Sequence, residues 1–172
     1  MKPVSVGERI YSYARNGDVA GLNSFDQKAL VENANWRHPR NYKQTPLYTA
    51  CKYGKLTAVN LLLKHGADPQ LCDEFGVSSF DVACIEGRTL VVQALLALKS
   101  SLALSPSSVV LACQEGRCSI LKLLFACGAS PELPLGEFTP LMAAALSNRV
   151  DVIDILMKAD VSLEVKFCFC FA

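Results

Sequence analysis

The sequence predicts an all-α fold in which short pairs of helices stack in a single row, as in a solenoid. The segment from Thr45 to Gly76 recurs downstream in weakened form, and self-similarity at a period of a few tens of residues is typical of repeat architectures. Each copy holds two short apolar patterns, neither of which could bury its apolar side alone. Small residues followed by a stop residue recur at steps of 33, 29 and 32 residues: Ala50-Cys51 with Gly54, Ala83-Cys84 with Gly87, Ala112-Cys113 with Gly116, and Ala144-Ala145 with Asn148.

The copy that begins at Thr45 carries the clearest helix signals. Thr45 is a good N-cap and Pro46 stands at the first helical position, so a helix is expected to run to about Tyr53 and to end at Gly54. A second helix is expected up to Gly66, because apolar residues recur there at helical spacing: Ala58, Val59, Leu62 and Leu63.

These motifs resemble the ankyrin repeat. The residues that carry the resemblance are TPLYTACKYG and LLLKHGADP in the clearest copy, and GASP and TPLMAAA further on. The resemblance extends from about Glu8 to Val165. It departs from the family pattern at Tyr48, where the family usually has His. The resemblance implies about five helix-turn-helix repeats, a projecting loop or finger between successive repeats, and a concave face that binds other proteins.

We expect three parts in the chain: an extension at 1–7, a repeat array at 8–166 and an apolar tail at 167–172. The repeats are expected at 8–44, 45–76, 77–106, 107–138 and 139–166. The first repeat is degenerate, because it lacks the T-P-L start and has a polar outer side suited to a terminal cap. In its finger, Asn33 to Lys43, we expect Trp36 to fold back on the cap; contact with a phosphate or an acidic peptide is the alternative.

The third repeat is expected to end in a shortened finger. After Leu98, the residues KSSL replace the G-A-D turn, and the D-x-x-G pattern is missing. We therefore expect a notch in the concave face between Lys99 and Ser107.

The end of the chain leaves two interpretations open. A terminal repeat should be polar on its outer face, yet the last repeat and the tail KFCFCFA are apolar. Either the tail folds over the last repeat, or the chain is a shortened form of a longer protein with an uncovered stack face.

Composition and cysteine positions exclude several classes of function. A formal charge of +1 does not favour a nucleic-acid partner. No run suits a signal peptide or a membrane span, so we expect an intracellular protein in the cytoplasm or nucleus. Cys51, Cys84 and Cys113 occupy one repeat position, with Ala145 in the last repeat, which indicates a packing role. The other cysteines and the two histidines lack zinc-site spacing, and no metal or cofactor is expected.

No catalytic motif is present, so we expect no enzymatic activity. The chain has no G-x-S-x-G, P-loop or H-E-x-x-H pattern, and no Cys with a suitably placed His.

The family resemblance places partner contacts at the finger tips and at the two positions before the inter-helix stop. The chemistry of these positions changes along the array, from basic and aromatic through acidic to apolar. We expect the aromatic residues Tyr42, Tyr53 and Phe75 to contribute most. The candidate contact residues are Arg15, Tyr42, Gln44, Lys52, Tyr53, Glu74, Phe75, Val77, Ile85, Glu86, Gln114, Glu115, Phe138 and Leu146.

The sequence thus favours a non-enzymatic module that binds a protein partner through its concave face, as a scaffold, adaptor or inhibitor. It is expected to act as a monomer or within a hetero-complex. The alternative is the targeting part, or a shortened form, of a larger signalling protein or enzyme such as a kinase or ubiquitin ligase.

Overall fold

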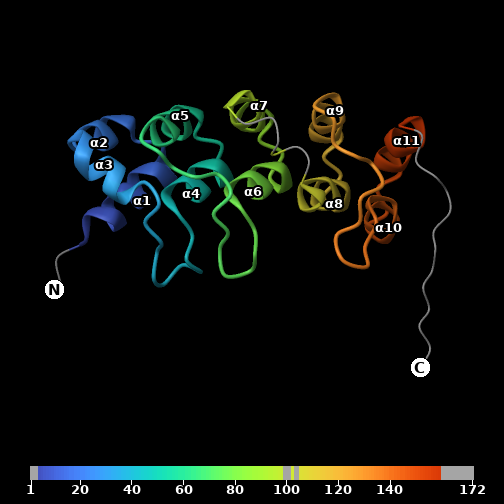
Figure 1. Ribbon diagram of the computed structural model, residues 1–172, viewed down its shortest axis with the longest axis horizontal. Helices are drawn as coiled ribbons and strands as arrows, with labels where there is room; N and C mark the ends of the chain where they lie inside the picture. The colour runs from blue at the N-terminus through green and yellow to red at the C-terminus, as the bar shows by residue number, and fades with distance from the viewer. Residues whose placement is uncertain (1–3, 99–101, 103–104, 160–172) are drawn as a thin grey trace.

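The helices lie in two rows that run along the length of the molecule (Figure 1). A computed structural model describes residues 4–98, 102 and 105–159 of the chain. The inner row, from which the fingers project, contains α1 (Val6–Asn16), α4 (Pro46–Lys52), α6 (Ser79–Ile85), α8 (Pro106–Gln114) and α10 (Pro140–Leu146). The outer row contains α2 (Val19–Asn23), α3 (Gln27–Asn33), α5 (Leu56–Lys64), α7 (Thr89–Leu98), α9 (Cys118–Ala126) and α11 (Val150–Lys158).

Each inner helix packs against the next inner helix and against its own outer helix. This arrangement confirms the all-α solenoid, because successive helix pairs pack on one another along the row. None of the described helices has both the length and the apolar character needed to cross a lipid bilayer.

The local signals around Thr45 act as predicted. The Thr45 side chain accepts a hydrogen bond from the Tyr48 backbone N–H at 3.0 Å, and Pro46 is the first residue of α4. Gly54 then takes the left-handed conformation, with a φ of 68°, that ends the helix. Thr139 caps α10 in the same way, accepting from Met142 at 3.1 Å.

The first repeat differs from the others in its outer helix, which is broken into α2 and α3. Asp18 caps α2 by accepting from the Gly21 N–H at 2.8 Å, and Asp26 caps α3 by accepting from Ala29 at 2.7 Å. The second cap starts a new helix instead of continuing the first, since an N-cap residue lies outside helical conformation.

Trp36 folds back on the first helix, as expected. Its ring meets Tyr11 edge-on at 6.4 Å between centroids and meets His38 at 5.3 Å. It also occupies the space that a side chain on Gly7 would need. Glycine at position 7 therefore allows the tryptophan to lie against α1.

Three fingers, residues 34–45, 65–78 and 127–139, project on one side of the inner row (Figure 1). The connection from α7 to α8 takes only residues 99–105, so it is half as long as the second finger. The expected notch between Lys99 and Ser107 lies mostly outside the described residues. At the tip of the last finger, Leu135 and Phe138 exchange backbone hydrogen bonds of 2.8 and 3.1 Å across a tight turn.

The cysteines at the shared repeat position are fully buried between the inner helices. Cys51, Cys84 and Cys113 have no exposed surface, which confirms the packing prediction. Burial raises the pKa of Cys113 to about 12 and raises the pKa values of Cys51 and Cys84 well above their ordinary range. Ala145 does not share this environment and is exposed, because no further inner helix packs beyond α10 in the described part of the chain.

The expectations for the end of the chain lie outside the described residues. These are the last residues of the fifth repeat, 160–166, and the tail, 167–172.

Candidate functional site

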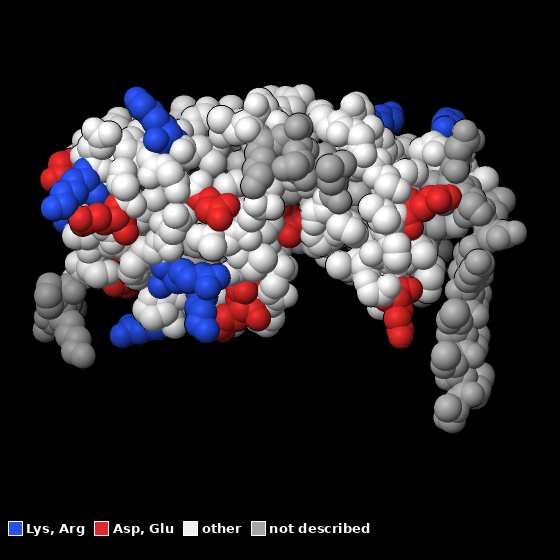
Figure 2. Space-filling view, viewed as in Figure 1, with Lys and Arg blue, Asp and Glu red and all other residues white. Residues whose placement is uncertain are grey.

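The candidate site is the concave face. We define this face as the exposed residues at the carboxyl ends of α1, α4, α6, α8 and α10, together with the finger tips at 41–44, 74–77 and 135–138. Figure 2 shows the molecule hollowed on this side, between the first two fingers and the last one. Lys and Arg gather over the first finger in this view, whereas the last finger carries acidic residues.

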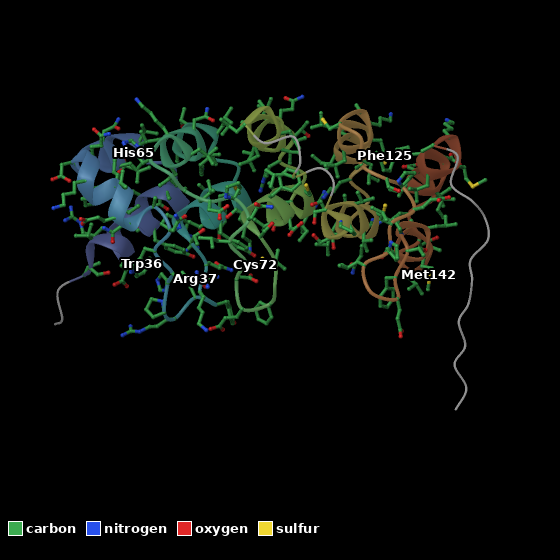
Figure 3. All side chains as sticks on the ribbon, viewed as in Figure 1. Trp36, Arg37, His65, Cys72, Phe125 and Met142 are labelled. Carbon is green, nitrogen blue, oxygen red and sulfur yellow. The ribbon has the colours of Figure 1, made fainter. Side chains whose placement is uncertain are left out.

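The first two fingers are tied to each other. The Asn35 side chain donates to the Gly66 backbone oxygen at 3.1 Å and accepts from the Asp68 N–H at 2.8 Å. The Arg37 guanidinium donates a hydrogen bond to the Cys72 backbone oxygen; both residues are labelled in Figure 3. These bonds hold the finger tips in a fixed relative position.

A finger-tip cluster of Tyr42, Lys43, Glu74 and Phe75 forms where these two fingers end. The rings of Tyr42 and Phe75 lie 5.1 Å apart, although the two residues are 52% and 71% exposed. Lys43 Nζ lies 3.5 Å from the Glu74 carboxylate. Glu74 therefore belongs to this cluster.

The finger-tip cluster is held in an unusual backbone conformation. Tyr42 and Lys43 both have positive φ angles, 52° and 55°, and left-handed backbone costs about 1–2 kcal/mol for each residue other than glycine. The Tyr42 backbone oxygen accepts a hydrogen bond from Glu74 N–H at 3.0 Å. Backbone strain of this kind often marks a functional position.

A second pair lies at the carboxyl ends of α1 and α4. The Arg15 guanidinium sits 5.3 Å from the centre of the Tyr53 ring, within the range of a cation–π contact. Tyr53 is still 41% exposed. Gln44 is nearby in the first finger, where its side-chain oxygen accepts a hydrogen bond from Tyr11 at 3.1 Å. Gln44 is thus already engaged within the protein, whereas Arg15 and Tyr53 present free surface.

Three arginines join the inner helices α4, α6 and α8 to the repeats that follow them. Arg88, Arg117 and Arg149 donate from Nε to the backbone oxygens of Lys52, Ile85 and Gln114, at 3.0, 2.6 and 3.1 Å. We call these three residues the arginine series. The bonds fix the carboxyl ends of α4, α6 and α8, where candidate contact residues lie.

Each member of the arginine series also lies against the glycine that ends the preceding inner helix. A Cβ atom on Gly54, Gly87 or Gly116 would meet the arginine Cδ at 3.0 to 3.2 Å. Sequence reasoning missed these contacts. A usable signal existed, because a basic residue directly follows the inter-helix stop in four copies: Lys55, Arg88, Arg117 and Arg149.

Other candidate residues are only partly available. Val77 is half-buried against the core, and its N–H donates to Asp73 at 3.0 Å. Ile85, Glu86 and Glu115 are also half-buried. Val77 therefore acts mainly in packing, while the two glutamates form no ion pair with any other residue that the structure describes.

The far end of the concave face contains an apolar pocket of about 290 Å³. It lies between α8, α10 and the last finger. The structure brings three candidate residues together here, since Gln114, Phe138 and Leu146 all contribute to the wall. The full lining is Val110, Leu111, Gln114, Leu135, Phe138, Ala143, Leu146 and Ser147.

A polar cluster around Asp81 joins α6 to α8 and was also missed from the sequence. The buried carboxylate accepts from Ser107 Oγ and Ser108 Oγ at 2.9 Å each, and from Ser78 Oγ at 2.7 Å. Ser78 and Asp81 form a capping box, for which S-x-x-D before an apolar run is the sequence signal. Because these bonds satisfy the carboxylate, we assign Asp81 a structural role.

Within the described residues, no group of three or more His, Cys, Asp or Glu side chains is arranged to hold a metal ion. Other depressions, of about 250 to 410 Å³, lie at α1, beside Asp81 and at the turn before α11.

Comparison with known proteins gives two family matches and a curated relative. Residues 30–83 match the family described as "Ankyrin repeats (many copies)", and residues 137–166 match "Ankyrin repeat". One relative is the Arabidopsis thaliana protein named "Putative E3 ubiquitin-protein ligase XBAT35", which is 37% identical over 71 residues. That match covers 40% of this chain and only 15% of the relative.

Proposed function

Because the chain belongs to the ankyrin repeat family, we propose that it is a non-enzymatic module that binds a protein partner along its concave face. In this family protein binding is the general role of the repeats. The proposal gives the chain the role of a scaffold, adaptor or inhibitor.

The observation that carries the proposal is the exposed finger-tip cluster. Tyr42 and Phe75 hold their rings 5.1 Å apart in solvent, and Tyr53 exposes a third ring next to Arg15. Aromatic and arginine side chains are enriched among the residues that dominate binding energy. Since the hydrogen bonds between the fingers fix these groups in advance, little ordering entropy opposes association.

Groups that could contact a partner lie along the whole length of the concave face. Basic and aromatic groups lie at its start, the carboxylates of Glu86 and Glu115 at its middle, and the apolar pocket at its end. Such a series suits an extended or helical segment of another protein better than a small ligand. A nucleic acid is a poor candidate, because the net charge is only +1.

A second proposal is that the chain is the targeting part, or a shortened form, of a larger protein. The match to a relative named as a ubiquitin ligase supports it, since the matched segment is 15% of that relative. In this case the concave face would select the substrate, and activity would reside in other segments.

We propose that the module acts in the cytoplasm or nucleus. The six cysteines among the described residues are free thiols, which suits a reducing compartment.

Affinity purification tests the proposal. The full chain and a Tyr53→Ala/Phe75→Ala variant serve as baits, and Asn60→Ala, on the exposed side of α5, serves as the matched control. We expect one or more proteins that bind the wild type and the control but not the double variant. A set of bound proteins that is the same for all three baits would contradict the proposal.

A further inference from the structure

We infer that the apolar pocket between α8, α10 and the last finger holds a bulky apolar side chain of the partner, and that basic residues flank this side chain in the partner's sequence. This inference rests on the proposed function and names the chemistry of the segment that the far end of the concave face recognises.

The pocket has an apolar wall and a polar edge. Val110, Leu111 and Leu135 form much of the wall, and Gln114 and Ser147 contribute polar groups. A volume of about 290 Å³ is at the lower limit of the range of about 300–1,000 Å³ found for small-molecule sites. The pocket is therefore large enough for one bulky side chain that enters from a longer segment.

Two lining residues expose much of their apolar surface to water. Leu146 is 73% exposed and Phe138 is 50% exposed. Removing apolar surface from water is favourable by about 25 cal/mol per Å². An apolar side chain placed between Leu146 and Phe138 would cover both. Burial of this apolar surface would therefore favour association.

Two acidic residues adjoin the lining residues in sequence, and their charge indicates which residues should flank the bound side chain in the partner. Glu115 directly follows Gln114, and Glu137 directly precedes Phe138 in the finger turn. Neither carboxylate forms an ion pair with the other described residues. Arg149 also lies at this end of α8, where its Nε donates to the Gln114 backbone oxygen at 3.1 Å, and it is the one positive charge of the arginine series bonded to a residue of the pocket wall.

This end of the face therefore differs in charge from the beginning. The first finger carries Arg37, Arg40 and Lys43, whereas the last finger carries Glu132 and Glu137 and no basic residue. Figure 2 shows the same contrast between the first finger and the last one. Complementary charges fix the orientation of a bound segment and exclude wrong partners, so a segment with Lys or Arg beside its apolar anchor fits the far end.

Selection from a displayed library of random twelve-residue peptides tests the inference, with the full chain as the target. We expect enriched peptides in which Trp, Phe or Leu stands next to Lys or Arg. A synthetic peptide of the enriched sequence should lose at least tenfold in affinity for Leu146→Lys, measured by fluorescence anisotropy. It should lose about threefold or more for Glu115→Gln/Glu137→Gln.

Leu146 and Glu137 are exposed, so these variants should fold, and circular dichroism checks that they do. Leu98→Lys changes an equally exposed leucine on the outer row and serves as the matched control. It should bind the peptide as the wild type does.

The possible outcomes separate this inference from the proposed function. Enriched peptides that are acidic, or whose binding is lost in Tyr53→Ala/Phe75→Ala but unchanged in Leu146→Lys, would overturn the pocket assignment and leave the concave face as the binding site. Failure to enrich any peptide would also overturn it. A different result would be peptides enriched on a Phe167→Ser/Phe169→Ser/Phe171→Ser variant and not on the wild type. That result would assign the pocket to the chain's own carboxyl-terminal residues, and not to a partner.

Discussion

The Nε atom of Arg117 donates a hydrogen bond to the backbone oxygen of Ile85, 2.6 Å away. The bond joins the turn before α9 to the carboxyl end of α6, in the preceding repeat. Because the carbonyls at a helix end lack partners within the helix, the arginine satisfies one of them. The same contact recurs at Arg88 and Arg149, so it sets the spacing of successive repeats along the concave face.

Arg117→Ala should lower the free energy of unfolding by about 1.5–3 kcal/mol, since hydrogen bonds that involve charged groups contribute this much. Urea unfolding followed by circular dichroism measures the change. Lys122→Ala removes an exposed charge from α9 and should stay within about 0.5 kcal/mol of the wild type. Equal effects of the two substitutions would show that Arg117 adds no stability between repeats.

Gly87→Ala should cost more stability than Gly66→Ala. Both glycines are left-handed, with φ of 69° and 85°, so alanine is strained at either position by about 1–2 kcal/mol. Only at Gly87 would the new Cβ meet another side chain, Arg117 Cδ at 3.2 Å, whereas nothing lies within 4 Å at Gly66.

A double-mutant cycle separates the two causes at Gly87. In an Arg117→Ala background the extra cost of Gly87→Ala over Gly66→Ala should disappear. If the extra cost persists in that background, contact with Arg117 is not its source.

Asp81→Ala should lower the free energy of unfolding by about 2–4 kcal/mol, because it leaves Ser108 buried without its partner and removes the bonds to Ser78 and Ser107. Chemical denaturation again provides the measurement. Asp154→Ala, at an exposed position of α11, is the matched control and should change stability by less than about 0.5 kcal/mol. A small loss at Asp81 would mean that the polar cluster contributes little to the α6–α8 contact.

The buried cysteines should make the fold sensitive to alkali. Burial raises the pKa of Cys113 from 9.0 to about 12, so between these pH values the unfolded chain releases a proton that the folded chain keeps. The free energy of unfolding should therefore fall with rising pH, by at most about 1.4 kcal/mol per pH unit for each such thiol. Cys51 and Cys84 act in the same direction.

Replacing Cys51, Cys84 and Cys113 with Ala isolates this contribution. Urea unfolding at pH 8 and at pH 10.5 should show a smaller loss of stability in the triple variant than in the wild type. Tyr11 and Tyr48, whose pKa values burial also raises, are common to both proteins. The same pH dependence in both would contradict a role for the thiols.

Much of the fold could be predicted because its signals are local. Thr45 with Pro46 at a helix start and Gly54 at its end act within a few residues of sequence. The repeat period then placed Cys51, Cys84 and Cys113 at equivalent buried positions. The break between α2 and α3 was not predicted, although Asp26 is a good N-cap.

The contacts between repeats were harder to predict. Arg117 reaches Ile85 and Asp81 reaches Ser108 across about thirty residues of sequence, and the choice of partner depends on how the helices stack. The same limit applied to the finger tips. The tie between the first two fingers brings Glu74 to Lys43, a pairing that the sequence alone did not indicate.

The most direct test of the concave face as a binding site is the affinity of one purified partner for single variants of the chain. By isothermal titration, Tyr53→Ala and Phe75→Ala should each weaken binding by more than about 1 kcal/mol, or about fivefold, with the circular dichroism unchanged. Asn60→Ala and Gln93→Ala, at exposed positions of the outer helices, should leave the affinity within twofold of the wild type. Full affinity in both concave-face variants, or a loss confined to the outer-helix variants, would contradict the account.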